Sequence, residues 1–237
     1  MRRKSNNRYR HLFGLALLLA LILGAGCEPL APENRAREED GLVAVRVVRV
    51  VDGDTLVVAL PDGAEERLRL IGVDTPEISE PPEPFGLEAA AYAAEHLDGR
   101  RVFLETDVAP RDRYGRLLGY LWLDSPSGLS GEDHVREKLF NARLLLDGYA
   151  QLMTVPPNVK YADHFREFQR EARENGRGLW GTAVDEEDSY IGNSSTRRFH
   201  RPDCASAGRI APQNQIRFET RADAFNSDYE PCRICKP

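Results

Sequence analysis

Three short apolar segments separated by tight turns constrain the fold of this 237-residue chain more than any other feature. They run from Val43 to Val51, from Thr55 to Leu60 and from Glu65 to Val73, with Asp52-Gly53-Asp54 and Pro61-Asp62-Gly63 between them. Apolar residues that alternate along such segments are typical of β-strands, and the Asp-Gly pairs are typical of tight turns. We therefore predict a meander of three strands, which is how a small β-barrel begins.

The chain up to residue 181 completes an α+β domain that begins at residue 41. Two further strands are predicted at Arg101 to Thr106 and Leu117 to Leu123. Three helices are predicted at Leu87 to Leu97, Lys138 to Leu146 and Ala162 to Glu174. Beyond the last helix we expect Gly178-Leu179-Trp180 to return to the core as an apolar plug.

Residues 1 to 26 have the pattern of an export signal. A basic segment is followed by an apolar run from Leu12 to Leu23 and then by small residues before Cys27. We predict lipidation of Cys27, export, and anchoring on the periplasmic or cell-surface face of a membrane. The alternative is an uncleaved signal anchor, although the apolar run is short for a full span. Residues 27 to 40, rich in Pro, Glu and Arg, are predicted to be a tether.

The net charge of −6 limits how the chain could bind nucleic acid. Five of its positive charges lie in residues 1 to 26, so the chain without that segment would carry −11. Long-range electrostatic attraction to a polyanion requires the opposite sign. Any contact with nucleic acid must therefore come from a local cluster of arginines.

Two acidic motifs predict a metal site. Asp52 and Asp54 are two apart and face the same way in an extended chain. Asp54 and Asp74 offer hard oxygen ligands without a neighbouring histidine or cysteine, which suits Ca²⁺ or Mg²⁺. Glu77 lies just beyond Asp74, close enough to act as general base on a water near the metal.

Two arginines complete a candidate site for phosphodiester cleavage. Arg69 and Arg116 could stabilise negative charge on phosphate oxygens, because guanidinium binds phosphate bidentately and stays charged. Arg69 and Asp74 are five residues apart and would lie on opposite faces of a regular strand. We therefore predict a break in strand pairing near Gly72, where a bulge or kink is easiest.

Each element also has an ordinary structural explanation, since Asp-Gly-Asp is a common turn and Arg69 could be a surface charge. The combination is far more specific. In order, VDGDT, RLRLIGVDTPE and RDRYGR resemble the thermonuclease (staphylococcal-nuclease-like) family, over about Val43 to Trp180. The resemblance implies a five-stranded OB-fold barrel with three helices. It also implies Ca²⁺-dependent hydrolysis of DNA and RNA that leaves 3′-phosphate ends.

The same resemblance implies the metal ligands. Asp54 and Asp74 match the calcium carboxylates, and Thr75 would contribute its backbone carbonyl. Asp52 matches an acidic residue behind these ligands.

It also implies the catalytic and substrate-binding residues. Glu77 matches the general base, and Arg69 and Arg116 match the phosphate-binding arginines. Arg113 and Tyr114 correspond to residues beside the substrate groove.

The chain departs from the family pattern around the substrate. Family members often have a stacking tyrosine just before the segment Pro156-Pro157-Asn158, where this chain has Met153-Thr154-Val155. We expect Tyr161 to pack rather than stack on substrate. The loop that follows Glu77 is acidic. Because stacking contributes about 1–3 kcal/mol per base, we expect weaker substrate binding, or stacking supplied from elsewhere.

The C-terminal part differs in composition and predicts a small metal-binding module. An acidic linker at residues 182 to 189 leads to residues 190 to 237, where His200-x3-Cys204 precedes Cys232-x2-Cys235. This spacing is typical of a structural zinc site. The alternative is a Cys232–Cys235 or Cys204–Cys232 disulfide, since an exported chain meets oxidising conditions. The segment resembles the Ada-type metal-binding domain, with histidine in place of its first cysteine, and that resemblance implies a zinc module able to contact DNA.

Three functions remain to be separated. The leading hypothesis is a membrane-anchored, Ca²⁺-dependent nuclease acting on DNA and RNA, with structural Zn²⁺, expected to be monomeric. The second is an OB-fold module that binds nucleic acid or protein without catalysis. The third is a zinc-dependent surface adaptor with a structural barrel.

Overall fold

The computed structural model describes residues 41–124, 131–181 and 187–237. All of these residues belong to one unit of the chain, Ala36–Pro237. The predicted signal, the lipidation of Cys27 and the tether lie outside the described residues and stay predictions. Within the described ranges, no helix combines the length and the apolar character that a membrane crossing needs.

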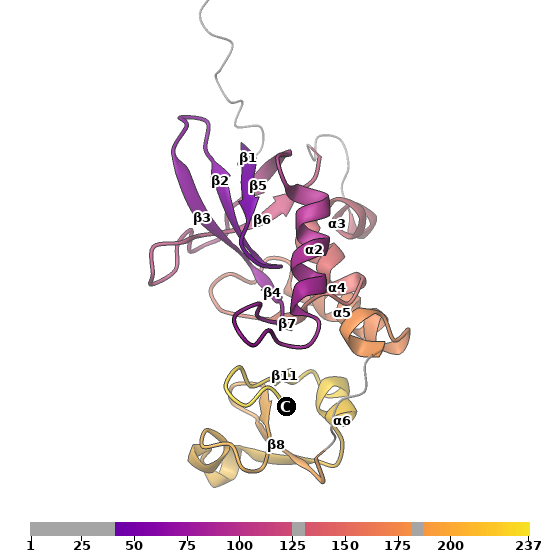
Figure 1. Ribbon diagram of the computed structural model, residues 1–237. Coiled ribbons are helices and arrows are strands. Elements are labelled where there is room, and N and C mark those ends of the chain that lie inside the picture. The colour runs from indigo at the N-terminus through magenta and orange to yellow at the C-terminus, as the bar shows by residue number, and fades with distance from the viewer. Residues whose placement is uncertain (1–40, 125–130, 182–186) are drawn as a thin grey trace, which may run out of the picture. The chain divides into compact units, whose positions relative to one another are not determined.

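Five strands close into a barrel in the order β1-β2-β3-β6-β5 (Figure 1). Their bounds are β1 Leu42–Val50, β2 Thr55–Ala59, β3 Glu65–Leu70, β5 Arg101–Glu105 and β6 Leu117–Trp122. Antiparallel pairing joins β1 to β2, β2 to β3, β1 to β5 and β5 to β6. The barrel closes where β3 runs parallel to β6. The predicted meander and five-stranded barrel are confirmed.

Alternation along β2 and β3 separates the core from the site. Leu56 and Leu68 are partners in the register and are fully buried in the hydrophobic core. The adjacent pair, Thr55 and Arg69, must face the other way because successive side chains alternate. The apolar half of the pattern thus fills the barrel, and the polar half gathers on its opposite surface.

Four helices surround the barrel. They are α2 Gly86–Leu97, α3 Glu132–Lys138, α4 Phe140–Leu146 and α5 Ala162–Glu174. In α2, Ala89, Ala93 and Leu97 are buried at a spacing of four residues, which is one face of a helix. Helix α5 has the predicted bounds, and Tyr161 before it packs edge-on against Tyr120, as expected.

The helix predicted from Lys138 to Leu146 is present as α4, which begins two residues later, whereas the preceding helix α3 was not predicted. Two helices flank Leu139, whose backbone is extended with φ −85° and ψ 112°. Leu139 is completely buried and forms a β-bridge with Trp122 at the end of β6. This tertiary contact overrides the continuous helical pattern of the local sequence.

The predicted break near Gly72 is confirmed. Strand β3 ends at Leu70, and β4 (Gly72–Asp74) pairs instead with β7 (Gln151–Met153), outside the barrel. Gly72 has φ +80°, a left-handed conformation that glycine adopts without strain. A Cβ atom there would lie 2.6 Å from the ring of Phe165 in α5. The chain can turn sharply here because residue 72 is glycine. The left-handed backbone and the close approach of Phe165 both exclude a larger residue.

Helix α5 also holds β7 in place. Gln169 is buried in this helix, and its side-chain oxygen accepts a hydrogen bond of 2.7 Å from the backbone N–H of Leu152. Phe165 and Phe168 of the same helix are buried in the core. The small sheet of β4 and β7 is thus fixed by one face of α5.

The C-terminal module has its own sheet and core. Its strands are ordered β10-β8-β9-β11, with bounds β8 Tyr190–Asn193, β9 Arg198–His200, β10 Gln215–Phe218 and β11 Glu230–Pro231. Its helices are α6 Arg221–Asn226 and the short 3₁₀ turns η2 Ala207–Arg209 and η3 Pro212–Asn214. Its core consists of Tyr190, Phe199, Phe218, Ala224, Phe225 and Tyr229.

The expected plug at Gly178-Leu179-Trp180 was placed wrongly. This segment forms the 3₁₀ turn η1 Gly178–Gly181, and Trp180 packs against the core of the module, not the core of the barrel. Its indole ring lies edge-on to Phe225 at 5.2 Å between centroids.

Substituting Gly72 by alanine should destabilise the fold severely. A left-handed non-glycine residue costs about 1–3 kcal/mol, and overpacking against Phe165 adds a comparable amount. Gly63→Ala is the matched control, because Gly63 also has a positive φ of 87° but nothing within 4 Å of its missing Cβ. Denaturant unfolding should show a larger loss for Gly72→Ala than for Gly63→Ala. Equal losses would mean that Phe165 does not restrict this position.

Candidate active site and metal centre

The turn between β1 and β2 is shaped by Asp52. Its Oδ1 atom accepts hydrogen bonds from the backbone N–H groups of Asp54, at 3.0 Å, and Thr55, at 2.7 Å. A side chain that binds the backbone two residues ahead stabilises a tight turn. A Cβ on Gly53 would lie 2.7 Å from Thr75, so glycine lets the turn approach that residue. Asp52 therefore positions Asp54 beside Thr75.

The carboxylate of Asp54 is buried and fully engaged. Only 5% of the residue is exposed. Its Oδ2 accepts a hydrogen bond of 2.8 Å from the backbone N–H of Thr75, and its Oδ1 accepts one of 3.2 Å from the Thr55 hydroxyl. The same Oδ1 lies 3.0 Å from Nε of Arg69. Residues from β1–β2, β3 and the end of β4 therefore meet at this carboxylate.

Arg69 joins the two predicted metal-binding carboxylates. Its Nη2 lies 2.7 Å from Oδ1 of Asp74, while its Nη1 donates 2.8 Å hydrogen bonds to the carbonyl oxygens of Leu70 and Val73. These two carbonyls lie on either side of Gly72. The bend in the chain thus closes around the guanidinium group, and Arg69, Asp54 and Asp74 share one site as the sequence predicted.

The site carries more negative than positive charge. The pKa of Asp54 is raised to about 7. Burial is the largest cause and the charges of Asp52 and Asp74 add to the rise, whereas Arg69 and the Thr75 N–H oppose it. Three carboxylates near one guanidinium leave a charge imbalance that a divalent cation would neutralise. The donors are all oxygen atoms, which matches the preference of Ca²⁺. The Thr75 hydroxyl is buried without a hydrogen-bond partner in the described part of the chain, so a further polar atom is available there. These residues fit a calcium ion.

The predicted general base lies in an exposed loop after β4. The backbone N–H of Glu77 donates a 3.0 Å hydrogen bond to Oε2 of Glu83, and the N–H of Glu83 donates one of 2.8 Å back to the Glu77 carbonyl. This reciprocal pair fixes the backbone, while the side chain of Glu77 stays in solvent. Its carboxylate forms no hydrogen bond or ion pair with Asp54, Arg69 or Asp74 as far as the chain is described.

Arg116 precedes β6 and is oriented by a carboxylate of its own turn. Its Nε lies 2.7 Å from Oδ2 of Asp112. Two residues later, Leu118 is the register partner of Arg69 in the parallel pair of β3 and β6. Side chains two apart in a strand share a face, so Arg116 approaches the same side of the barrel as Arg69. No ion pair among the described residues joins Arg116 to the carboxylate cluster.

The predicted groove residues are exposed beside Arg116. Tyr114 is 69% exposed. The guanidinium carbon of Arg113 lies 4.7 Å from the centre of its ring, and that of Arg116 lies 5.9 Å away. An exposed aromatic ring flanked by two cations could contact both a base and a phosphate.

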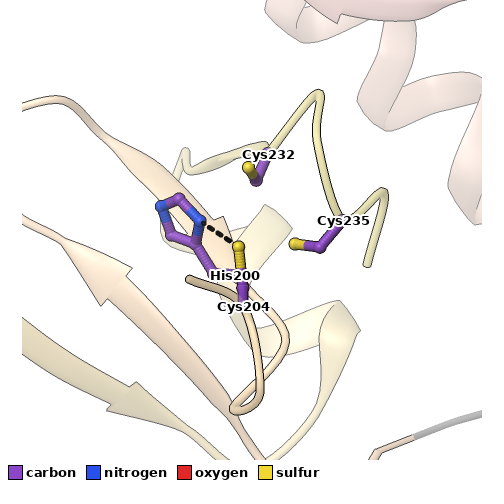
Figure 2. Close-up of side chains that lie close together, drawn as sticks. All are labelled: His200, Cys204, Cys232 and Cys235. Atoms are coloured by element: carbon purple, nitrogen blue, oxygen red, sulfur yellow. Dashed lines mark hydrogen bonds between the residues drawn. The ribbon is translucent and has the colours of Figure 1, made fainter. Parts of the chain in front are cut away.

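The four predicted metal ligands of the C-terminal module converge (Figure 2). The ligand atoms of His200, Cys204, Cys232 and Cys235 all lie within 4.8 Å of one another. His200 ends β9, Cys204 follows in the next turn, and the two later cysteines follow β11. Backbone N–H groups of Arg201 and Ile234 point at the sulfurs of Cys235 and Cys232, at 3.5 and 3.4 Å. Soft ligands in one tetrad fit a zinc ion.

The structure does not support the disulfide alternative. Cys204, Cys232 and Cys235, the three cysteines within the described ranges, are all free thiols. Burial, and then the positive charge of Arg198, lower the pKa of His200. Its imidazole is therefore neutral at physiological pH, the form in which histidine binds metal. The histidine is thus in its metal-binding form, and the three cysteines are not joined to one another.

The sequence did not identify the module's residues that lie near Asp74. The Nε atom of Arg233 is 3.8 Å from Oδ2 of Asp74, and Lys236 forms an ion pair with Glu83. Arg233 and Lys236 lie in the Cys232–Cys235 loop and directly after it. Loop composition alone gave no signal that these cations would meet an acidic site more than a hundred residues earlier in the chain.

Comparisons with known proteins agree with this arrangement. Residues 67–182 match the family model described as "Staphylococcal nuclease homologue", and residues 184–237 match "Metal binding domain of Ada". The thermonuclease of Staphylococcus intermedius is 39% identical over 137 residues, which are 56% of this chain and 74% of that protein. Endonuclease YncB of Bacillus subtilis is 34% identical over 158 residues, 65% of this chain and 69% of that protein. With the closed barrel, these similarities show that the chain belongs to the family of staphylococcal nuclease homologues.

Proposed function

We propose that this protein is a Ca²⁺-dependent nuclease that hydrolyses phosphodiester bonds of DNA and RNA and leaves 3′-phosphate ends. The observation that carries the proposal is the buried Arg69, held between Asp54 and Asp74 at the bend between two sheets. Relatives named thermonuclease and endonuclease support the same reaction. The product ends follow from the family resemblance.

Asp54, Asp74 and Thr75 would hold the calcium ion. When bound, the ion supplies Lewis acidity toward a phosphate oxygen and lowers the pKa of a nearby water. Asp52 keeps the Asp54 carboxylate in place through the turn that it stabilises. Arg69 fixes Asp74 relative to Asp54 through its two charged contacts.

Glu77 and the arginines perform the remaining steps. The exposed Glu77 carboxylate accepts the proton of the attacking water. Arg116 and Arg69 donate hydrogen bonds to phosphate oxygens as negative charge builds on them, and Arg113 and Tyr114 contact the substrate beside the bond that breaks. Arg116 reaches the phosphate from the Asp112 turn, which orients its guanidinium group.

A binding module without catalysis is the principal rival. A module of that kind does not need two metal carboxylates, a general base and two arginines together. This chain has all five, and three of them are joined by ion pairs in a buried cluster. A zinc-dependent adaptor is the other rival. An adaptor of this kind needs only the C-terminal tetrad, and its function would not explain the cluster of Asp54, Arg69 and Asp74 on the barrel.

The C-terminal tetrad is proposed to bind structural Zn²⁺. A module of about 48 residues is too small to be stabilised by a hydrophobic core alone, and a metal is a common solution. The ligands lie in two pairs on different segments, so one ion would tie the end of β9 to the loop after β11.

Glu77→Gln and Arg116→Ala should each lose most of the hydrolysis of single-stranded DNA. Removal of a general base or of one phosphate donor costs about 10²–10⁴-fold and 10²–10³-fold, respectively. Both side chains are partly or fully exposed, so the fold should persist, as circular dichroism would verify. Arg111→Ala is the matched control: this exposed arginine of the same turn pairs with Glu66 and should keep wild-type turnover. Wild-type turnover in Glu77→Gln would rule out the proposed general base.

The affinity for Ca²⁺ should fall with acidification through about pH 7. Because the pKa of Asp54 is raised to about 7 in the metal-free protein, its carboxyl is neutral below that pH and ionised above it. Calcium binds the ionised form and must displace a proton at lower pH, so the affinity should drop by up to about tenfold per pH unit below 7 and level off above 8. Calorimetric titration would measure this, with Asp54→Asn as a variant that binds weakly at every pH. An affinity independent of pH below about 7 would contradict this role for Asp54.

Cys204→Ser and Cys232→Ser should each lower the zinc content of the purified protein. Loss of one ligand of a tetrahedral site weakens binding of the ion and destabilises the module that it closes. Elemental analysis would measure the metal. His164→Ala is the control, since His164 belongs to a different and more exposed group with Glu132 and Glu167 and should leave the zinc content unchanged. Full zinc content in both cysteine variants would show that the tetrad does not hold the ion.

A further inference from the structure

A cleft of about 430 Å³ opens next to the predicted calcium ligands. Asp74, Thr75 and Glu83 line one side, and cations of the C-terminal module line the other: Arg201, Arg221, Arg233 and Lys236. These four cations are called the cationic wall below. The volume is that of a small-molecule pocket, which admits a stretch of single strand rather than a duplex.

Specific contacts hold the module against the barrel domain beside this cleft. The backbone N–H of Thr154, which follows β7, lies 3.1 and 3.0 Å from the two carboxylate oxygens of Glu230 in β11. Burial raises the pKa of Glu230. The hydrogen bond from Thr154 and the charge of Arg198 oppose this rise and offset part of the cost of burying the carboxylate. The guanidinium of Arg173 lies over the ring of Phe225 at 4.9 Å. The cationic wall is therefore fixed near Asp74 by contacts that do not involve the wall itself.

The two parts of the chain carry opposite charge. Residues 41 to 181 contain 17 Arg and Lys against 24 Asp and Glu, whereas residues 190 to 237 contain eight against five. A polyanion is repelled by the first part on average and attracted by the second. The cations that line the cleft itself all belong to the module.

Arg233 is free to exchange its present partner for a phosphate. Its contact with Asp74 is long, at 3.8 Å, and its side chain is 56% exposed. An exposed ion pair of this kind contributes little stability. A phosphate beside the metal would satisfy the guanidinium bidentately, which is a stronger interaction. Once Ca²⁺ neutralises Asp74, the attraction of Arg233 to that carboxylate weakens further.

The module binds the segment that lacks an aromatic residue. The segment before Pro156, Met153-Thr154-Val155, has no aromatic ring to stack on a base. The Thr154 backbone N–H binds Glu230 of the module. The same module supplies the cations of the neighbouring cleft.

We propose that the cationic wall binds the phosphates of single-stranded nucleic acid next to the bond that is cleaved, so that the C-terminal module forms half of the substrate groove. This inference rests on the proposed nuclease function and assigns part of its substrate binding to the module. The opposite role is autoinhibition, in which Arg233 competes with the metal for Asp74. The two roles differ in sign: loss of Arg233 weakens substrate binding in the first and strengthens metal binding in the second.

The test is the salt dependence of oligonucleotide binding in the Glu77→Gln background, which separates binding from hydrolysis. Fluorescence anisotropy with a single-stranded DNA oligonucleotide and saturating Ca²⁺ would compare this protein with the same protein carrying Arg233→Ala and Lys236→Ala. Each lost phosphate contact should make the slope of log K against log salt shallower by about 0.7, or about 1.4 for both. With Glu77 intact, the same double substitution should raise KM and leave kcat close to wild type.

Arg209→Ala and Arg217→Ala provide the matched control, because both residues are exposed cations of the module that do not line the cleft. This pair should leave the salt slope unchanged. Zinc content and thermal unfolding would verify that every variant keeps its module folded. An unchanged slope in the Arg233/Lys236 variant, or tighter Ca²⁺ binding with higher activity, would overturn the proposal while leaving the nuclease function intact. Absence of hydrolysis by the wild type would instead count against the nuclease function, and the binding measurement would remain interpretable.

Discussion

The site depends on one buried guanidinium group. Arg69 reaches Asp54 in the turn before β2 and Asp74 in β4, and it satisfies two backbone carbonyls at the bend around Gly72. Removing one partner from a buried charged cluster leaves an uncompensated charge, which is strongly destabilising. The turn at Asp52, the glycine at position 72 and the burial of Thr75 can all be understood as conditions for this contact. The same interaction that stabilises the fold here positions the carboxylate oxygens that are proposed to bind metal.

Burial of negative charge is the physical basis for the proposed cation binding. The raised pKa of Asp54 reports that the protein pays a desolvation cost which Arg69 alone does not offset. A site of this kind is less stable without its ion than an apolar core would be. Glu77 is exposed and Arg116 is half-buried against Asp112, and neither forms an ion pair with the cluster among the described residues. The buried part of the site is the part proposed to hold metal, and the side chains around it are proposed to meet substrate.

Much of the carboxylate–arginine site was predictable because the residues that form each of its parts are close in sequence. The Asp52–Asp54 turn and the Arg69–Asp74 bend are local, so spacing, alternation and the position of Gly72 were enough to predict them. Long-range packing was not predictable in this way. Leu139 interrupts a helix because it pairs with Trp122, and Trp180 packs on Phe225 in the module rather than in the barrel. The approach of Arg233 to Asp74 depends on docking of the module, which no local pattern encodes.

Because of the bend at Gly72, the site lies between two sheets. Arg69 belongs to the barrel, whereas Asp74 belongs to the strand pair β4–β7, whose position is set by α5 through Phe165 and the Gln169 bond to Leu152. A small displacement of α5 would therefore move one carboxylate relative to the other without disturbing either strand internally. The geometry of metal binding is in this sense adjustable from a helix that contributes no ligand, so substitutions there could tune the spacing of Asp54 and Asp74.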